Sequence, residues 1–357
     1  MTDMMKKNIF SLLVLLSLFS FGNLTAQQSN RWSEEKAANW YKSQGWLVGA
    51  NFLPSTAINQ LEMFQADTFD PITINREFSW ASAIGMNTMR VYLHDLAWKA
   101  DPKGFKKRID QLLSIAKKNK IKILFTIFDD CWNPDAAIGL QPAPKPGIHN
   151  SGWVRSPNKA THDDSTQWKY LETYVKDILS SFKNDQRILM WDLYNEPGNS
   201  GYGLSSLPLL KKIFEWAWAV RPNQPITGAS WRSNKVIDEY LISNSDVITF
   251  HNYSDAANLE KDILQKLKIG RPVICSEYMA RTKGSKFQTH LPIFKKYNVG
   301  AINWGLVAGK SNTIYQWDTP IVDGSEPKLW FHDIFRKDGS AYDPAETEVI
   351  QSLTSKK

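Results

Sequence analysis

Several features are scarce in this chain of 357 residues, and each absence excludes a class of protein. Two cysteines are too few for a disulfide-built scaffold or for a zinc site with four thiolate ligands. Beyond the N-terminal segment, no apolar run reaches the length of about eighteen residues that a transmembrane helix needs. Basic stripes are also lacking, because the 43 Lys and Arg are scattered among 36 acidic residues. The formal net charge of +7 is therefore ordinary surface charge rather than a nucleic-acid footprint.

The N-terminal segment has the three-part layout of a secretory signal. Lys6 and Lys7 precede the apolar stretch Ile9–Phe21, and a short polar segment ending at Ala26 follows. We predict a signal peptide over residues 1–26, cleaved near Ala26, with cleavage after Gly22 or a retained anchor helix as alternatives. The mature protein is then secreted or periplasmic, has no stable membrane span, and contains 357 − 26 = 331 residues. Residues 27–357 read as one domain, because no linker or repeat interrupts them.

Short apolar runs alternate with segments of helical period along this domain, as in parallel strands joined by crossover helices. Eight strands are expected, at Trp46–Pro54, Thr88–His94, Ile121–Asp130, Ile188–Pro197, Pro225–Arg232, Val247–Ser254, Pro272–Arg281 and Ala301–Lys310. Helices are expected at Phe105–Asn119, Gln167–Phe182, Leu207–Val220, Asn234–Ser243, Leu259–Leu267 and Ser285–Tyr297, among others. The pattern predicts an α/β fold, a closed (β/α)8 TIM barrel. An open doubly wound sheet is the less favoured alternative, because no glycine-rich phosphate turn follows the first strand.

Three segments outside these elements have expected places in a barrel. Residues 31–43 predict a helix that closes the barrel floor. Residues 131–166 and 311–330 form two unusually long connections, after strands three and eight. In a barrel both connections leave the strands at the face where active sites are built. The chain also contains 15 Trp and 12 Tyr, whose flat amphipathic rings suit contact with a sugar as well as core packing.

The sharpest motif ends the fourth strand, where Trp191-Asp-Leu-Tyr-Asn-Glu-Pro197 stands. It resembles the glycoside hydrolases of clan A, especially family 5 of the cellulase and mannanase type, whose fourth strand ends in Asn-Glu-Pro. The resemblance makes Glu196 the general acid/base. It implies a second Glu at the end of strand seven, and Glu277 lies there, 81 residues later (277 − 196). Paired carboxyls suit glycoside hydrolysis, in which one protonates the leaving oxygen and the other attacks the anomeric carbon.

Other positions match the same resemblance. It implies that Arg90 on strand two lies beside the nucleophile and that the hydroxyl of Tyr253 bonds it. It also implies that His251 lines the pocket, that Trp304 forms an aromatic platform under the sugar, and that Asn195 bonds the sugar 2-hydroxyl.

The chain departs from the family at strand three. Many members have a His there, whereas this chain has Phe128-Asp-Asp-Cys-Trp132. We therefore expect different recognition at this corner, with sugar contacts from Asp130, Trp132 or Trp153. The rings of Trp132 and Trp153 could alternatively pin the long loop to the barrel.

Two alternatives to a glycosidase stay open. Acids and histidines of the third loop could hold a metal, although Asp129, Asp130, His149 and residues 162–164 match no compact ligand motif. A catalytically inert sugar-binding barrel would suit the aromatic content equally well. The preferred interpretation is a secreted, monomeric, retaining β-glycosidase without cofactor or metal. Two free thiols are also expected, with Cys275 buried, because Cys131 and Cys275 lie near strands on opposite barrel walls.

Overall fold

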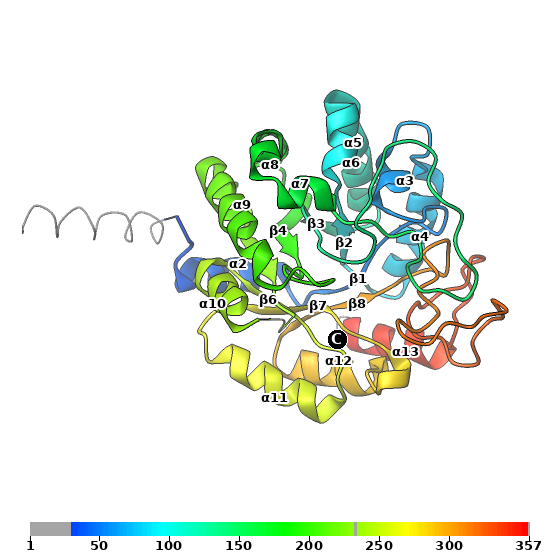
Figure 1. Cartoon of the computed structure of the whole chain (residues 1–357). Helices are drawn as coiled ribbons and strands as arrows, with labels where there is room; N and C mark the ends of the chain where they lie inside the picture. Colours follow the sequence, from blue (N-terminus) through cyan, green and yellow to red (C-terminus); the bar gives the residue numbers. More distant parts are fainter. Residues whose placement is uncertain (1–29, 232–233, 356–357) are drawn as a thin grey trace, which may run out of the picture.

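The structure is a computed structural model that describes residues 30–231 and 234–355. The predicted signal peptide lies outside the described residues. Eight parallel strands form one sheet in the order β5-β4-β3-β2-β1-β8-β7-β6 (Figure 1). They are β1 Val48–Asn51, β2 Thr88–Tyr92, β3 Lys122–Thr126, β4 Ile188–Asn195, β5 Ile226–Ala229, β6 Ile248–His251, β7 Val273–Glu277 and β8 Gly300–Trp304. A bridge between Ser230 and Phe250 joins β5 to β6, so the predicted TIM barrel is confirmed.

Helices surround these strands (Figure 1). They are α2 Glu34–Gln44, α3 Gln60–Phe64, α4 Pro71–Ala83, α5 Asp95–Ala100, α6 Pro102–Lys118, α7 Lys159–Asp163, α8 Trp168–Phe182, α9 Leu207–Val220, α10 Lys235–Asn244, α11 Ala256–Leu267, α12 Phe287–Lys296 and α13 Pro344–Thr354. None of the helices in the described ranges is long and apolar enough to cross a membrane.

The strand residues are almost all buried, as expected for a parallel sheet covered by helices outside and filled by side chains inside. Helices α8 and α9 show the matching pattern, because each buries one apolar face, including Leu171 and Ile178 on α8 and Ile213 on α9. Leu207–Val220 was predicted to the residue. The other predicted helices are recovered with ends that differ by at most three residues.

Helix α2 closes the barrel floor, as predicted. Trp40 and Tyr41 of this helix pack against a separate apolar cluster inside the barrel. Its strand members are Leu124, Leu189, Met190, Ile274 and Ile302. The hydroxyl of Tyr41 donates to the carbonyl of Asn298 at 2.9 Å, just before β8. Because this end is filled, the opposite end of the barrel is left for a site.

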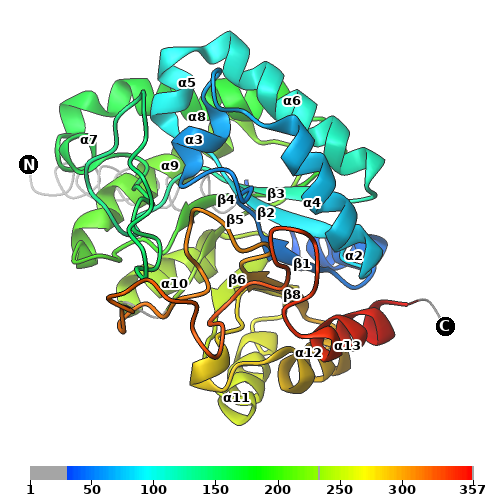
Figure 2. The same ribbon diagram turned by 90° about the vertical axis from the view of Figure 1, so that its right-hand side faces the viewer.

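The two long connections lie together at the carboxyl ends of the strands. The backbone NH of Asn150 donates to the carbonyl of Ser311 at 2.9 Å, and that of Ile321 donates to Gly147 at 3.1 Å. Figure 2 shows the green loop after β3 and the orange loop after β8 side by side in front of the barrel strands. The mouth of the barrel is thus partly covered by chain from both loops.

Candidate active site

A cavity of about 360 Å³ lies at the carboxyl ends of the strands. Its lining combines ring side chains with polar side chains. The rings are Trp132, His149, Trp153, Trp231, Tyr253, Trp304 and Trp317, and the polar groups include Asp129, Cys131, Asn195, Glu196, Asn199 and Glu277. A pocket with aromatic walls and convergent polar groups is the usual form of a small-ligand site.

Glu196 and Glu277 enter this cavity from opposite parts of the barrel. Glu277 is the last residue of β7, and Glu196 follows β4 directly. The ladder between β4 and β5 shifts register between Asp192 and Asn195, a local irregularity of the kind that re-aims side chains near active sites. Glu196 also has a positive φ of 46°, a left-handed conformation that costs energy for any residue but glycine.

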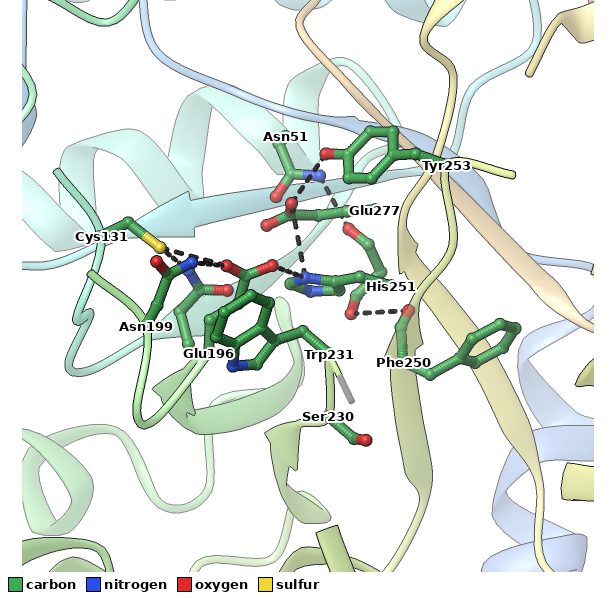
Figure 3. A network of polar contacts seen from close by, with 12 residues as sticks. Asn51, Cys131, Glu196, Asn199, Ser230, Trp231, Phe250, His251, Tyr253 and Glu277 are labelled. Atoms are coloured by element: carbon green, nitrogen blue, oxygen red, sulfur yellow. Dashed lines mark hydrogen bonds and ion pairs between the residues drawn. The ribbon is translucent and has the colours of Figure 1, made fainter. Parts of the chain in front are cut away.

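The two carboxyls lie close together around one ring nitrogen. Carboxylate oxygens of Glu196 and Glu277 and a ring nitrogen of His251 all lie within 4.8 Å of one another. Nδ1 of His251 is 2.5 Å from Oε1 of Glu196 and 3.4 Å from Oε2 of Glu277. Figure 3 shows the two carboxyls close together, with this ring beside them and a dashed line from its nitrogen to each. A second register shift, between Phe250 and His251, places His251 beside Glu277.

Three donors hold the carboxylate of Glu277. Arg90 Nη1 and the hydroxyl of Tyr92 donate to Oε1 at 2.7 and 2.8 Å, and the hydroxyl of Tyr253 donates to Oε2 at 2.8 Å. These contacts place Arg90 and Tyr253 where the resemblance expects them. Charge-assisted hydrogen bonds of this kind fix the carboxylate and favour its ionised form.

Arg90 is itself fixed by neighbours and does not line the cavity. It is fully buried and donates to Asp192 at 2.5 Å from Nη2 and to Asn51 at 2.9 Å from Nη1. Nη2 also donates to the side-chain oxygen of Asn195 at 2.7 Å. Arg90 therefore acts on a ligand through Glu277 and Asn195 rather than by direct contact, which revises its predicted place among the substrate contacts.

Glu196 has a different set of partners. The thiol of Cys131 donates to its Oε2 at 3.3 Å, and the amide of Asn199 donates to the same oxygen. Burial raises the pKa of Glu196, and these two hydrogen bonds oppose the rise. The two carboxyls thus differ in their surroundings, with a guanidinium and two hydroxyls on Glu277 and weaker neutral donors on Glu196.

Burial also changes the other titratable groups at the site. It raises the pKa of Glu277, and the nearby Glu196 adds to the rise, whereas Arg90 and Tyr253 act in the opposite direction. It lowers the pKa of His251 to about 4, so this imidazole is neutral at neutral pH. A neutral Nδ1 can donate to an ionised Glu196 or accept a proton from the protonated acid.

Both predicted third-loop tryptophans reach the cavity. Trp132 is partly exposed, and its ring lies 5.4 Å from that of His149. Trp153 is 3% exposed, packs 5.5 Å from the platform ring of Trp304, and donates from Nε1 to Asp129 at 2.7 Å. Trp153 therefore pins the loop and lines the cavity at the same time.

The structure places Asp130 away from the cavity, in contrast to its predicted sugar contact. Its carboxylate accepts from the hydroxyls of Tyr194 and Ser206 and from the backbone NH of Gly198, which uses its oxygens inside the protein. Asp129 lines the cavity instead, and it accepts from the amide of Asn195 at 2.8 Å. Adjacent residues leaving a strand point in opposite directions, so the sequence could not say which of the two faces the cavity.

Comparison with known proteins supports the same fold. Residues 138–314 match the family model for the TIM barrel domain of glycosyl hydrolases family 2. No curated protein matches the sequence. An endo-β-1,4-mannanase from Thermotoga petrophila is 14% identical, with a TM-score of 0.58 over 88% of this chain and 77% of its own.

Two further structures are similar. The GH5_18 protein from Streptomyces cattleya, solved with GlcNAc, is 12% identical, with a TM-score of 0.59 over 88% of this chain and 81% of its own. An exo-β-1,4-mannosidase from Opitutaceae bacterium strain TAV5 is 16% identical, with a TM-score of 0.59 over 86% of this chain and 59% of its own. The chain resembles the glycosidase barrels of clan A. The family model names family 2 whereas the motifs resemble family 5, so the family number stays a prediction.

Several residues of this site were missed from sequence. Tyr92 lies two residues after Arg90 on β2, so strand alternation could have placed it on the same face. Asn199 and Trp231 follow strands four and five, and they had no recognisable motif. His149 and Trp317 belong to the long loops, whose path over the barrel mouth depends on tertiary contacts.

The alternative metal set of the third loop is not assembled. In residues 30–231 and 234–355, Glu196, His251 and Glu277 form the one group of His, Cys, Asp or Glu close enough to share an ion. His162 instead contacts Asp163 at 2.8 Å through Nδ1, away from the cavity. Cys131 and Cys275 are both free and Cys275 is buried, as predicted, and Cys131 is buried as well.

Proposed function

We propose that the protein is a retaining O-glycosidase that cleaves β-linked saccharides by double displacement. The observation that carries the proposal is the closeness of the two carboxyls, since one oxygen of each lies within 4.8 Å of the other at the cavity. Retaining enzymes hold their carboxyls about 5–5.5 Å apart, whereas inverting enzymes leave about 6.5–9.5 Å for a water molecule.

In the first step, an oxygen of Glu277 attacks the anomeric carbon and forms a glycosyl ester. The bond to the leaving oxygen breaks, and Glu196 gives that oxygen its proton. Arg90, Tyr92 and Tyr253 suit Glu277 to the nucleophile role because they orient its carboxylate and stabilise its ionised form against the effect of burial. Glu196 suits the acid role because burial raises its pKa and so retains a proton for donation.

In the second step, water replaces the leaving group. Glu196, now ionised, takes a proton from this water, whose oxygen attacks the anomeric carbon and releases the Glu277 carboxylate. Asn195 sits between Arg90 and Asp129, so its amide is fixed at the edge of the cavity where a sugar hydroxyl would lie. The Trp304 ring forms another part of the cavity wall.

The first substrates to test are β-1,4-linked mannosides, because similar structures include a mannanase and a mannosidase. The purified mature protein should be assayed on aryl β-glycosides and on β-mannans, β-glucans and xylans, with Glu277→Gln as the matched inactive control. Hydrolysis that the control lacks supports the proposal. Saccharide binding without turnover on the whole panel would favour an inert binding barrel instead.

A further inference from the structure

Two hollows on opposite sides of the carboxyl pair differ strongly in size. Next to Glu196, a hollow of about 210 Å³ continues from the main cavity, lined by Trp231, His251 and Asn252 among others. Behind the paired rings of Trp153 and Trp304, a separate hollow offers about 20 Å³, which is room for one water molecule. The space beside Glu196 is therefore much larger than the space behind Trp304, and we call these two sides the open and the closed side.

The closed side is built from both long loops. Nδ1 of His149 contacts the carbonyl of Tyr315 at 2.8 Å. A Cβ at Gly147 would meet the carbonyl oxygen of Ile321 at 1.8 Å, so the loops touch backbone to backbone there. The ring of Trp317, from the loop after β8, lies 6.4 Å from His149 and adds to this side of the cavity.

The roles of the two acids determine which end of the substrate lies on each side. Because Glu196 protonates the leaving oxygen, the leaving part of the substrate lies on the side of Glu196, Asn199 and Trp231. The sugar whose anomeric carbon is attacked then lies toward Trp304, with its non-reducing side against the closed end. A longer chain has no space to continue past the Trp153–Trp304 pair.

We infer that the protein acts on chain ends and removes one sugar at a time from the non-reducing end of its substrate. The inference rests on the proposed function and adds the substrate class: saccharides with a free non-reducing terminal unit. The residues that set this specificity are Trp153, Trp304, His149 and Trp317, and the open Glu196 side accepts the remaining chain.

The test uses β-1,4-linked pentasaccharides of mannose, glucose and xylose, each carrying a fluorescent label at the reducing end. We expect free monosaccharide from the first turnovers, with labelled products that shorten from five units to four and then to three. Early labelled fragments of one or two units, or release of disaccharides, would overturn the inference. So would turnover of an aryl monoglycoside with no pentasaccharide shortened.

A second probe has a bulky ether on the 4-hydroxyl of the terminal non-reducing sugar. We expect the native protein to leave it intact and Trp317→Ala to hydrolyse it at a measurable rate, because that change opens the closed side. Trp231→Ala is the matched control, because it removes an indole ring from the open side, and it should leave the blocked probe intact. Native cleavage of the blocked probe, no gain in Trp317→Ala, or an equal gain in Trp231→Ala would contradict the inference.

Different results would contradict the proposed function and the assignment to chain ends. Inactivity on every pentasaccharide and every aryl glycoside counts against the proposed function itself. Activity with cuts inside the chain leaves the proposed function in place and removes only the assignment to chain ends.

Discussion

Nδ1 of His251 lies 2.5 Å from Oε1 of Glu196 and 3.4 Å from Oε2 of Glu277, so one nitrogen contacts both carboxyls. Because burial lowers the pKa of His251 to about 4, this ring adds no positive charge near neutral pH. Arg90 supplies positive charge on the Glu277 side, at 2.7 Å. The resulting asymmetry between two adjacent acids underlies the predictions that follow.

Substrates with different leaving groups distinguish the roles of Glu277 and Glu196. Glu277→Ala should abolish turnover of all substrates. Glu196→Ala should slow substrates with poor leaving groups by about 10²–10⁴-fold, because their oxygen needs a proton, and should slow activated aryl glycosides much less. Steady-state kinetics on a series of aryl glycosides checks this. Equal losses across the series would argue against Glu196 as the acid.

The pH dependence should be bell-shaped. The rate rises with pH as Glu277 loses its proton, and it falls again as Glu196 loses its own. Since burial raises the pKa of Glu196, the alkaline limb should lie above the ordinary carboxyl range. The limbs belong to the coupled pair rather than to single residues. A rate that does not change with pH, on a substrate that needs acid assistance, would contradict the model.

Asn199 should affect the pH at which the rate falls on the alkaline limb of the pH profile. Its amide donates to Glu196 and lowers the pKa of that carboxyl, so Asn199→Ala should move the limb to higher pH. Asn184→Ala is the matched control, because Asn184 is exposed near the opposite end of β4. The pH profile of kcat/KM should shift in the first variant only. A shift to lower pH in Asn199→Ala would contradict the account.

Replacing Trp132 distinguishes a role in substrate contact from a role in packing the loop. Trp132→Ala should lower catalytic efficiency on the natural saccharide with little change in Tm, because the ring is partly exposed at the cavity edge. Kinetics and thermal unfolding on the same preparation check this. A fall in Tm with unchanged kinetics would make the ring a packing element.

A buried ion pair should hold the last helix and the loop after β8. Arg281 pairs with Glu346 of α13 at 2.6 Å, and it also donates to the carbonyls of Trp330, His332 and Asp333. Removing one partner leaves a buried charge uncompensated, so Glu346→Gln should cost about 3–5 kcal/mol of unfolding free energy. Glu348→Gln, on the exposed face of the same helix, should change little. Denaturant unfolding of both variants measures the difference.

The sequence predicted those parts of the molecule that repeat or that form a short motif. Strand and helix alternation predicted the barrel, and Glu196 and Glu277 were found because a motif ends each of their strands. Which of Asp129 and Asp130 faces the cavity could not be predicted from the sequence. Both residues are buried, and only the path of the chain beyond β3 decides their orientation. His149 and Trp317 meet through loop contacts between distant segments, for which no local pattern exists.

The stereochemistry of the first product tests the central claim most directly. Proton NMR during the first minutes of hydrolysis of a β-linked substrate distinguishes the two anomers before they interconvert. Double displacement through Glu277 predicts that the β-anomer of the released sugar accumulates first and the α-anomer appears later by mutarotation. Initial release of the α-anomer would require direct attack by water and would contradict the account.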